Sequence, residues 1–206
     1  MRSYTADPAA ARQANQNNYV DQSGKYIGEF TLAEAVTSRQ GTDGIEFSFK
    51  TREGQQANYL TLWTHNAKGE ALYGYKVLSA IMTVTGVQAL EPKQGNIKGP
   101  DGNSRQVTAF PALHGKPVGL VLQKVLYTKS DGKDGYKFNI FAPFNALSEL
   151  TAKEILDGNT QPKALGGIVA TLKDKDERTA GHPGAGQASA NGAPDDPFGD
   201  DLGQGF

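Results

Sequence analysis

Strict alternation of apolar and polar side chains over residues 45–50 constrains the fold more than any other feature of the sequence. Ile45, Phe47 and Phe49 are apolar, and each is followed by a polar residue. A period of two puts the apolar side chains on one face of a β-strand and the polar side chains on the other. The sequence therefore predicts a half-buried strand, and with it a sheet that turns one face toward a core.

The segments on either side continue this pattern. Residues 59–64 alternate, with Leu60 and Leu62 on the face opposite the aromatic side chains. Residues 25–36 also alternate, and the apolar side chains in one phase are Tyr26, Phe30, Leu32 and Val36. Short polar turns that contain glycine separate the three segments, and such turns are typical of β-hairpins. The three segments are therefore expected to form an antiparallel meander.

A change of period after the third strand predicts a helix. From Leu72 the apolar residues recur at intervals of three and four, up to Gly86. This spacing is typical of an amphipathic helix, and a glycine is a common residue just past a helix end. The following residues, 92–103, are rich in Gly, Asn and Lys, and we expect them to form a loop.

Strand composition returns in the second half of the chain. Residues 107–113 and 117–127 are predicted strands, and the nearly continuous apolar run 118–122 indicates a strand that is covered on both faces. A Gly- and Asp-rich turn leads to a returning strand over residues 136–141. A second, short helix is expected within residues 144–156.

The order of these elements predicts the fold. Three strands, a helix and two further strands follow the order of the OB-fold, a five-stranded Greek-key barrel. We therefore expect a mainly β protein, an OB-fold-like five-stranded antiparallel barrel with one helix between strands 3 and 4. Closure of the sheet into a barrel would leave no exposed sheet edge. The predicted organisation is a flexible arm over residues 1–24, an OB-like domain over 25–173, and a disordered linker with an acidic tail over 174–206.

Composition limits the class of protein. The chain has no cysteine, which excludes disulfides and Cys-based zinc sites. Its N-terminal residues lack the apolar segment of a secretory signal, and no run approaches the 18 apolar residues of a membrane span. We therefore expect a cytoplasmic protein without a membrane partner.

The C-terminal tail differs in charge from the rest of the chain. The 21 basic and 18 of the 22 acidic residues lie in residues 1–178, which gives this part a charge of +3. The last 28 residues hold four acids and no base. The residues predicted to bind a partner are Asp195, Asp196, Phe198, Asp200, Asp201 and Phe206. Exposed Phe side chains beside a carboxylate suit a pocket with a basic rim, whereas the alternative is a tail that only keeps the protein soluble.

The outward face of the early meander is the first candidate binding site. If Ile45 and Leu60 point inward, the side chains that point outward include Lys50, Arg52, Tyr59 and Trp63. Aromatic rings between cations suit single-stranded nucleic acid, because bases stack on the rings and cations contact the phosphates. The alternative is that the two aromatic side chains belong to the core.

The later hairpin and the start of the predicted helix are two further candidates. On the hairpin, the predicted nucleic-acid-binding residues are Lys124, Tyr127, Lys129 and Lys137. OB-folds use the loop between their last two strands to hold ligand, whereas the alternative is a solvated hairpin. At the helix start the candidates are Tyr73 and Lys76, whereas Tyr75 is expected in the core by its phase.

The sequence gives little indication of catalysis. The histidines, His65, His114 and His182, do not have metal-ligand spacing, and neither a phosphate-binding loop nor a nucleophile elbow occurs. An Asp-Gly-Lys-Asp-Gly stretch from Asp131 lacks the terminal glutamate of a calcium loop, since Ala142 takes that position. We expect no catalytic residue, no metal and no cofactor.

The tail pattern and the predicted fold together resemble bacterial and phage single-stranded DNA-binding proteins (SSBs). Their OB-fold binds the strand, and a flexible linker ends in an acidic peptide that closes on Phe. Asp195-Asp196-Pro197-Phe198 and the segment from Asp200 to Phe206 are similar to that peptide. The spacing differs, because Leu-Gly-Gln-Gly separates the last acids from the final Phe.

This resemblance implies a non-enzymatic protein that coats single-stranded DNA without sequence preference during phage replication, recombination or repair. The tail would recruit replication or recombination proteins in the host cytoplasm. The alternative is a protein-interaction module, such as a virion or recombination-accessory component, whose sheet binds protein and has no affinity for nucleic acid.

Overall fold

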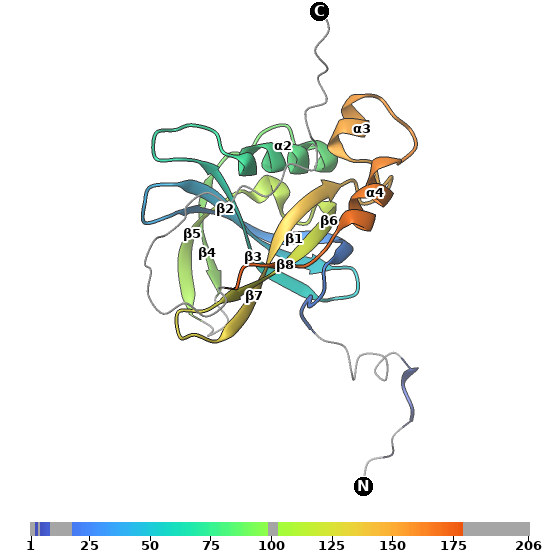
Figure 1. Ribbon diagram of the computed structural model, residues 1–206, viewed down its shortest axis with the longest axis horizontal. Coiled ribbons are helices and arrows are strands. Elements are labelled where there is room, and N and C mark those ends of the chain that lie inside the picture. The colour runs from blue at the N-terminus through green and yellow to red at the C-terminus, as the bar shows by residue number, and fades with distance from the viewer. Residues whose placement is uncertain (1–2, 4, 9–17, 99–102, 179–206) are drawn as a thin grey trace, which may run out of the picture.

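A computed structural model describes residues 3, 5–8, 18–98 and 103–178 of the chain (Figure 1). Its elements in chain order are β1 (Gly24–Thr37), β2 (Asp43–Thr51), β3 (Gln56–His65), α2 (Tyr73–Thr85), β4 (Lys93–Lys98), β5 (Ser104–Ala109), the 3-10 helix η1 (Pro111–Leu113), β6 (Pro117–Thr128), β7 (Asp134–Phe144), α3 (Ala152–Leu156), α4 (Ala164–Thr171) and β8 (Lys175–Asp176). The predicted mainly β architecture, with a helix after the third strand, is confirmed.

One long strand, β1, connects two halves of the sheet. Its first part pairs antiparallel with β6, from Gly24↔Leu122 to Glu29↔Pro117. Its later part pairs antiparallel with β2, and β2 pairs with β3. Because β6 also pairs with β7, the strands run in the order β3-β2-β1-β6-β7, with α2 between β3 and β6 in the chain.

The expected barrel is not closed. β3 and β7 approach each other, but no backbone pairing joins them in the described part of the chain. The two strands contact through side chains, and the core residues Phe138 and Ile140 of β7 pack in the same cluster as Leu60 of β3. The prediction of a barrel is therefore wrong in its closure, although the strand order that it requires is present.

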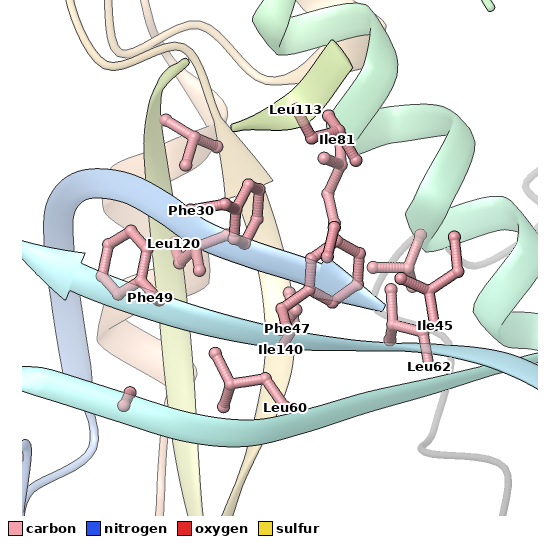
Figure 2. Packing of buried hydrophobic residues seen from close by; sticks show 14 of the residues in the cluster. Phe30, Ile45, Phe47, Phe49, Leu60, Leu62, Ile81, Leu113, Leu120 and Ile140 are labelled. Carbon is pink, nitrogen blue, oxygen red and sulfur yellow. The ribbon is translucent and has the colours of Figure 1, made fainter. Parts of the chain in front are cut away.

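The main core lies between the meander, α2 and the β6–β7 pair. Phe30 and Phe47 have ring centroids 4.6 Å apart, and Phe49 lies 6.0 Å from Phe30. Figure 2 shows these rings with Ile81 of α2 and Ile140 of β7 around them. All three phenylalanines are fully buried, and Ile45, Leu60 and Leu62 are each at most 8 % exposed. The phase predicted for β2 and β3 is confirmed.

The phase predicted for β1 is wrong after Phe30. The register with β2 shifts between Phe30 and Leu32, which marks a β-bulge at Thr31. A bulge inserts one residue and moves the following side chains to the other face. Ala33, at 3 % exposure, therefore faces the core beside Phe47, whereas Leu32 and Val36 are only half-buried.

A hairpin takes the place of much of the loop predicted over residues 92–103. β4 pairs with β5 from Lys93↔Ala109 to Lys98↔Ser104, and β5 meets β1 at Glu34↔Ala109. Most side chains of β4 are exposed, so its sequence has no alternating apolar face and gives no period to detect. Residues 99–102 of the predicted loop lie outside the described residues. The meander therefore extends to the order β3-β2-β1-β5-β4.

A second, smaller core covers the other side of β6. Val121, Phe144 and Leu165 are buried together, and Leu165 belongs to α4. Because Val118 and Leu120 face the main core, the prediction that residues 118–122 are covered on both faces is confirmed. Figure 1 shows α4 on the right of the view, on the side opposite the β4–β5 hairpin.

The segments next to the predicted domain boundaries lie against the sheet. Val20 is 2 % exposed, and its N–H donates to Gln56 O at 2.9 Å. At the other end, β8 pairs in parallel with β6 at Val125↔Lys175 and Leu126↔Asp176. The packed part of the chain thus includes residues on both sides of the predicted limits 25 and 173. Within the described residues, no helix is long and apolar enough to cross a membrane.

Candidate nucleic-acid interface

The outward side of β1, β2 and β3 is the open face of the sheet. On the β1–β6 side, α4 covers the outward side chains, such as Val121. On the meander side, the outward residues that bear on ligand binding are Glu34, Glu46, Lys50, Tyr59, Thr61 and Trp63, which define the open face here. The sheet is therefore covered by a helix on one half and presents exposed aromatic rings on the other.

Tyr59 is the most unusual residue of the open face. Its side chain is 75 % exposed, and its backbone φ is +62°. The register of β3 with β2 shifts between Phe47 and Phe49, so that Asn58 and Tyr59 form a bulge opposite Ser48. A left-handed backbone costs a residue with a side chain about 1–2 kcal/mol, and strained positions concentrate at functional sites. The bulge holds a large aromatic ring in solvent at an energetic cost.

Trp63 is the second exposed ring of the open face. It is 40 % exposed, and it pairs in register with Gly44 of β2. A Cβ atom on Gly44 would lie 2.8 Å from Cε3 of Trp63, so glycine is needed for the indole to lie across β2. One side of the ring is thus supported by the sheet. The alternative, that Tyr59 and Trp63 belong to the core, is not what the structure shows.

Carboxylates occupy the middle of the open face. Glu34 of β1 lies opposite Glu46 of β2, and Glu46 lies opposite Thr61 of β3. Two like charges in register repel each other. Arg105 of β5 offsets this repulsion, because Nη1 and Nη2 donate to the two carboxylate oxygens of Glu34 at 2.6 Å each. The fork geometry is the strong, bidentate form of this interaction.

Arg105 is a residue of the face that the sequence did not indicate. Its pKa is raised, mainly by the hydrogen bond to Glu34 and also by the negative charges of Glu34 and Glu46. The two hydrogen bonds to Glu34 hold the guanidinium over the open face, where its side chain is 53 % exposed. Arg105 lies between the expected loop over residues 92–103 and the predicted strand over 107–113, and only the pairing of β5 with β4 and β1 carries it to the open face.

The two predicted cations of the meander are exposed at one end of it. Lys50 lies near the end of β2, in register with Glu29 and Gln56. Arg52 follows in the turn, where its N–H donates to Ile27 O at 2.9 Å. Arg52 also lines a shallow pocket with Lys25 and Tyr26. The cations therefore lie at the β2–β3 turn, beyond the ring of Tyr59.

The structure separates Lys124 from the other predicted hairpin residues, because Lys124 lies on one face of the hairpin and Tyr127, Lys129 and Lys137 lie on the other. Lys124 is half-buried, donates to Asp21 O at 2.9 Å and lies 4.6 Å from the ring centroid of Tyr136. Lys137 of β7 lies opposite Val125 of β6, and its Nζ is 3.7 Å from a carboxylate oxygen of Glu177. These contacts give both lysines partners inside the protein.

The remaining hairpin candidates lie near its tip. Tyr127 is half-buried against Gly135, and Lys129 is exposed. A Cβ atom on Gly135 would lie 2.8 Å from the Lys129 side chain and 3.1 Å from the Tyr127 ring. Both side chains therefore lie over the backbone of β7 rather than over the open face.

At the start of α2 the structure reverses one expectation. Tyr73 is half-buried against the main core, and Lys76 is exposed. Tyr75, which was predicted in the core, is 46 % exposed and lies 5.2 Å from the ring of His65. The buried stripe of α2 consists instead of Val77, Leu78, Ile81 and Val84, so that Tyr75 falls on the outer side of the helix.

The predicted tail residues, from Asp195 to Phe206, lie outside the described residues. Comparison of the sequence with protein-family models and with curated proteins found no match. The open face carries two exposed rings on β3 and a bidentate Arg–Glu pair, and two cations lie near the β2–β3 turn. Such a surface can stack a flat aromatic ring of a ligand and contact negative charges beside that ring.

Proposed function

We propose that the protein binds single-stranded DNA without sequence preference through the open face, and that it does so without catalysis. The observation that carries this proposal is Tyr59, which is 75 % exposed on a left-handed backbone within a β-bulge. An exposed ring that costs free energy to hold suggests a ligand that repays the cost. Stacking of a base on such a ring is worth about 1–3 kcal/mol.

The arrangement favours single strands over duplex. In a duplex the faces of the bases are stacked on one another, so only an unpaired base offers its face to Tyr59 or Trp63. Because every base has such a face, stacking tolerates any sequence. Lys50, Arg52 and Arg105 add positive charge for the phosphates, but Glu34 and Glu46 reduce it. The affinity should therefore depend on salt only weakly.

The wider role follows from the resemblance to SSBs. We propose that the protein coats exposed strands during phage DNA replication, recombination or repair in the host cytoplasm. The acidic tail would recruit replication or recombination proteins, with Phe198 and Phe206 as its apolar anchors. This part of the proposal depends on the sequence of the tail alone.

The test is a salt series of fluorescence-polarisation titrations with labelled oligo-dT, oligo-dA and the matching duplex. Trp63 is the only tryptophan of the chain, so its fluorescence reports directly on the open face. We expect tight binding to both single strands, weak binding to duplex and quenching of Trp63. Absence of binding to any strand at low salt would overturn the proposal.

Matched variants locate the interface. Lys50→Ala should weaken binding uniformly across sequences and lower the salt slope by about 1. The control is Lys173→Ala, which removes the same charge from an exposed position after α4, on the half of the sheet that α4 covers and outside the open face. Equal effects of the two variants would show that the affinity comes from overall charge and not from the open face.

A protein-interaction module is the second candidate. The carboxylates of Glu34 and Glu46 on the open face favour it, because they repel phosphates. So do Leu147 and Leu156, whose side chains are 83 % and 75 % exposed. Failure of all nucleic acids to bind in the titrations above, with the protein folded, would favour this candidate over the first.

A further inference from the structure

We infer that Glu46 is a specificity-determining residue, which gives the open face a preference for bases that carry an exocyclic amino group. Cytosine would be favoured over uracil and thymine among the pyrimidines. The inference rests on the proposed function, because it concerns the strand that the open face would hold. Stacking would still accept every sequence, and Glu46 would add a bias at one base position.

Glu46 occupies the centre of the exposed aromatic row. Its register partner is Thr61 of β3, and Tyr59 and Trp63 lie two residues to either side of Thr61. Trp63 is the next outward position after Thr61, and the exposed bulge residue Tyr59 precedes Thr61 along β3, so the two rings come before and after the register partner of the carboxylate. A base that stacks on either ring therefore has its edge near Glu46.

The carboxylate of Glu46 is held in place and keeps an acceptor to offer. Thr61 Oγ1 donates to Oε2 at 3.1 Å, and no described residue donates a hydrogen bond to Oε1. Glu34 differs, because both of its oxygens accept from Arg105. Glu46 therefore has one carboxylate oxygen to which no described residue donates, whereas each oxygen of Glu34 already accepts from Arg105.

The chemistry of the bases decides the sign of the preference. An ionised carboxylate only accepts hydrogen bonds. Cytosine presents an N4 amino donor, whereas thymine presents the O4 acceptor at the same position, as uracil does. On the C4–C5 edge of the ring, cytosine would donate from N4 to Glu46, whereas uracil would place its O4 acceptor against the carboxylate. The N3–H donor of uracil lies on the Watson–Crick edge, so the preference applies to a base that turns its C4–C5 edge toward Glu46. Arg105 neutralises Glu34, so the neighbouring carboxylate does not add a second repulsion to the approach of the strand.

The experiment compares oligo-dC with oligo-dU of equal length at neutral pH, by polarisation and by quenching of Trp63. Uracil is used because it lacks the methyl group of thymine, so the two ligands differ only in the donor and acceptor pattern of the ring. The variant is Glu46→Gln, whose amide has nearly the same shape and can donate to O4. The matched control is Glu53→Gln, which removes one exposed negative charge in the β2–β3 turn.

We expect the unaltered protein to bind oligo-dC roughly 3- to 10-fold tighter than oligo-dU, as one partly exposed hydrogen bond to a charged group would give. Glu46→Gln should bring this ratio to about 1 or below. Glu53→Gln should leave the ratio unchanged, although both variants raise the overall affinity by removing a negative charge.

The outcomes separate the inference from the proposed function. Equal binding of oligo-dC and oligo-dU by the unaltered protein, or a preference that persists in Glu46→Gln, would overturn the inference and leave single-strand binding in place. No binding of either strand would overturn both. The comparison on the unaltered protein decides the question even where the variant fails to fold.

Discussion

Replacing Tyr59 by glycine and by alanine should separate the energetic cost of the bulge from the use of the ring. Both substitutions remove the same side chain, which is 75 % exposed, so the small loss of packing is common to the two. They differ in the backbone. At a φ of +62° alanine keeps the left-handed penalty of about 1–2 kcal/mol, and glycine does not.

The net difference is smaller than the penalty itself. Glycine also gives the unfolded chain more freedom, which costs about 0.5–1 kcal/mol relative to alanine. We therefore expect Tyr59→Gly to be more stable than Tyr59→Ala by about 0.5–1 kcal/mol. In DNA binding the two variants should be alike, because each lacks the ring. Each should lose about 1–3 kcal/mol of affinity for oligo-dT, which is roughly 5- to 150-fold.

The assay is urea unfolding of both variants, followed by circular dichroism, together with polarisation titrations at one salt concentration. Equal stability of the glycine and alanine variants would refute the argument that the bulge is strained. Unchanged affinity in both would refute the use of Tyr59 as a stacking platform. A difference in affinity between the two variants would show that backbone shape, and not the ring, matters for binding.

Three further predictions concern stability. Burial alone would raise the pKa of Glu154, but hydrogen bonds from Thr151, Lys163 and Ala164 outweigh it and lower the pKa to about 2. Glu154→Ala should therefore lower the free energy of unfolding by about 2–4 kcal/mol at pH 7. Because the stabilisation by the ionised carboxylate is lost as pH falls from about 4.5 toward 2, the difference in unfolding free energy between the variant and the unaltered protein should narrow in acid. A difference that does not change with pH in unfolding experiments would contradict this. Phe47→Ala should cost about 3–5 kcal/mol in thermal unfolding, and a loss below about 1 kcal/mol would contradict the packing against Phe30. Arg105→Ala should cost about 1–2 kcal/mol globally, because the Arg105 side chain is 53 % exposed but that of Glu34 is only 13 % exposed and would keep its charge beside Glu46. Amide exchange should also rise locally in β4 and β5. Unchanged exchange in the hairpin would show that Arg105 does not hold it.

The sequence by itself determined the meander and the helix. The alternation of Ile45, Phe47 and Phe49 fixed which face of β2 is buried, since a period of two leaves one choice of inner face. The same reasoning gave exposed Tyr59 and Trp63 side chains as one of two alternatives, and the structure has both rings exposed. These features depend on local periodicity, which a sequence displays directly.

Only the tertiary structure decided which residues share the open face. Arg105 reaches Glu34 from a hairpin whose first strand, β4, has no apolar period, because its side chains are mostly exposed and backbone pairing holds it against β5. Lys124 was a reasonable candidate from its neighbours, but contacts with Asp21 and Tyr136 occupy it. Such contacts join segments far apart in the chain, so they cannot be predicted from the residue pattern of any one segment.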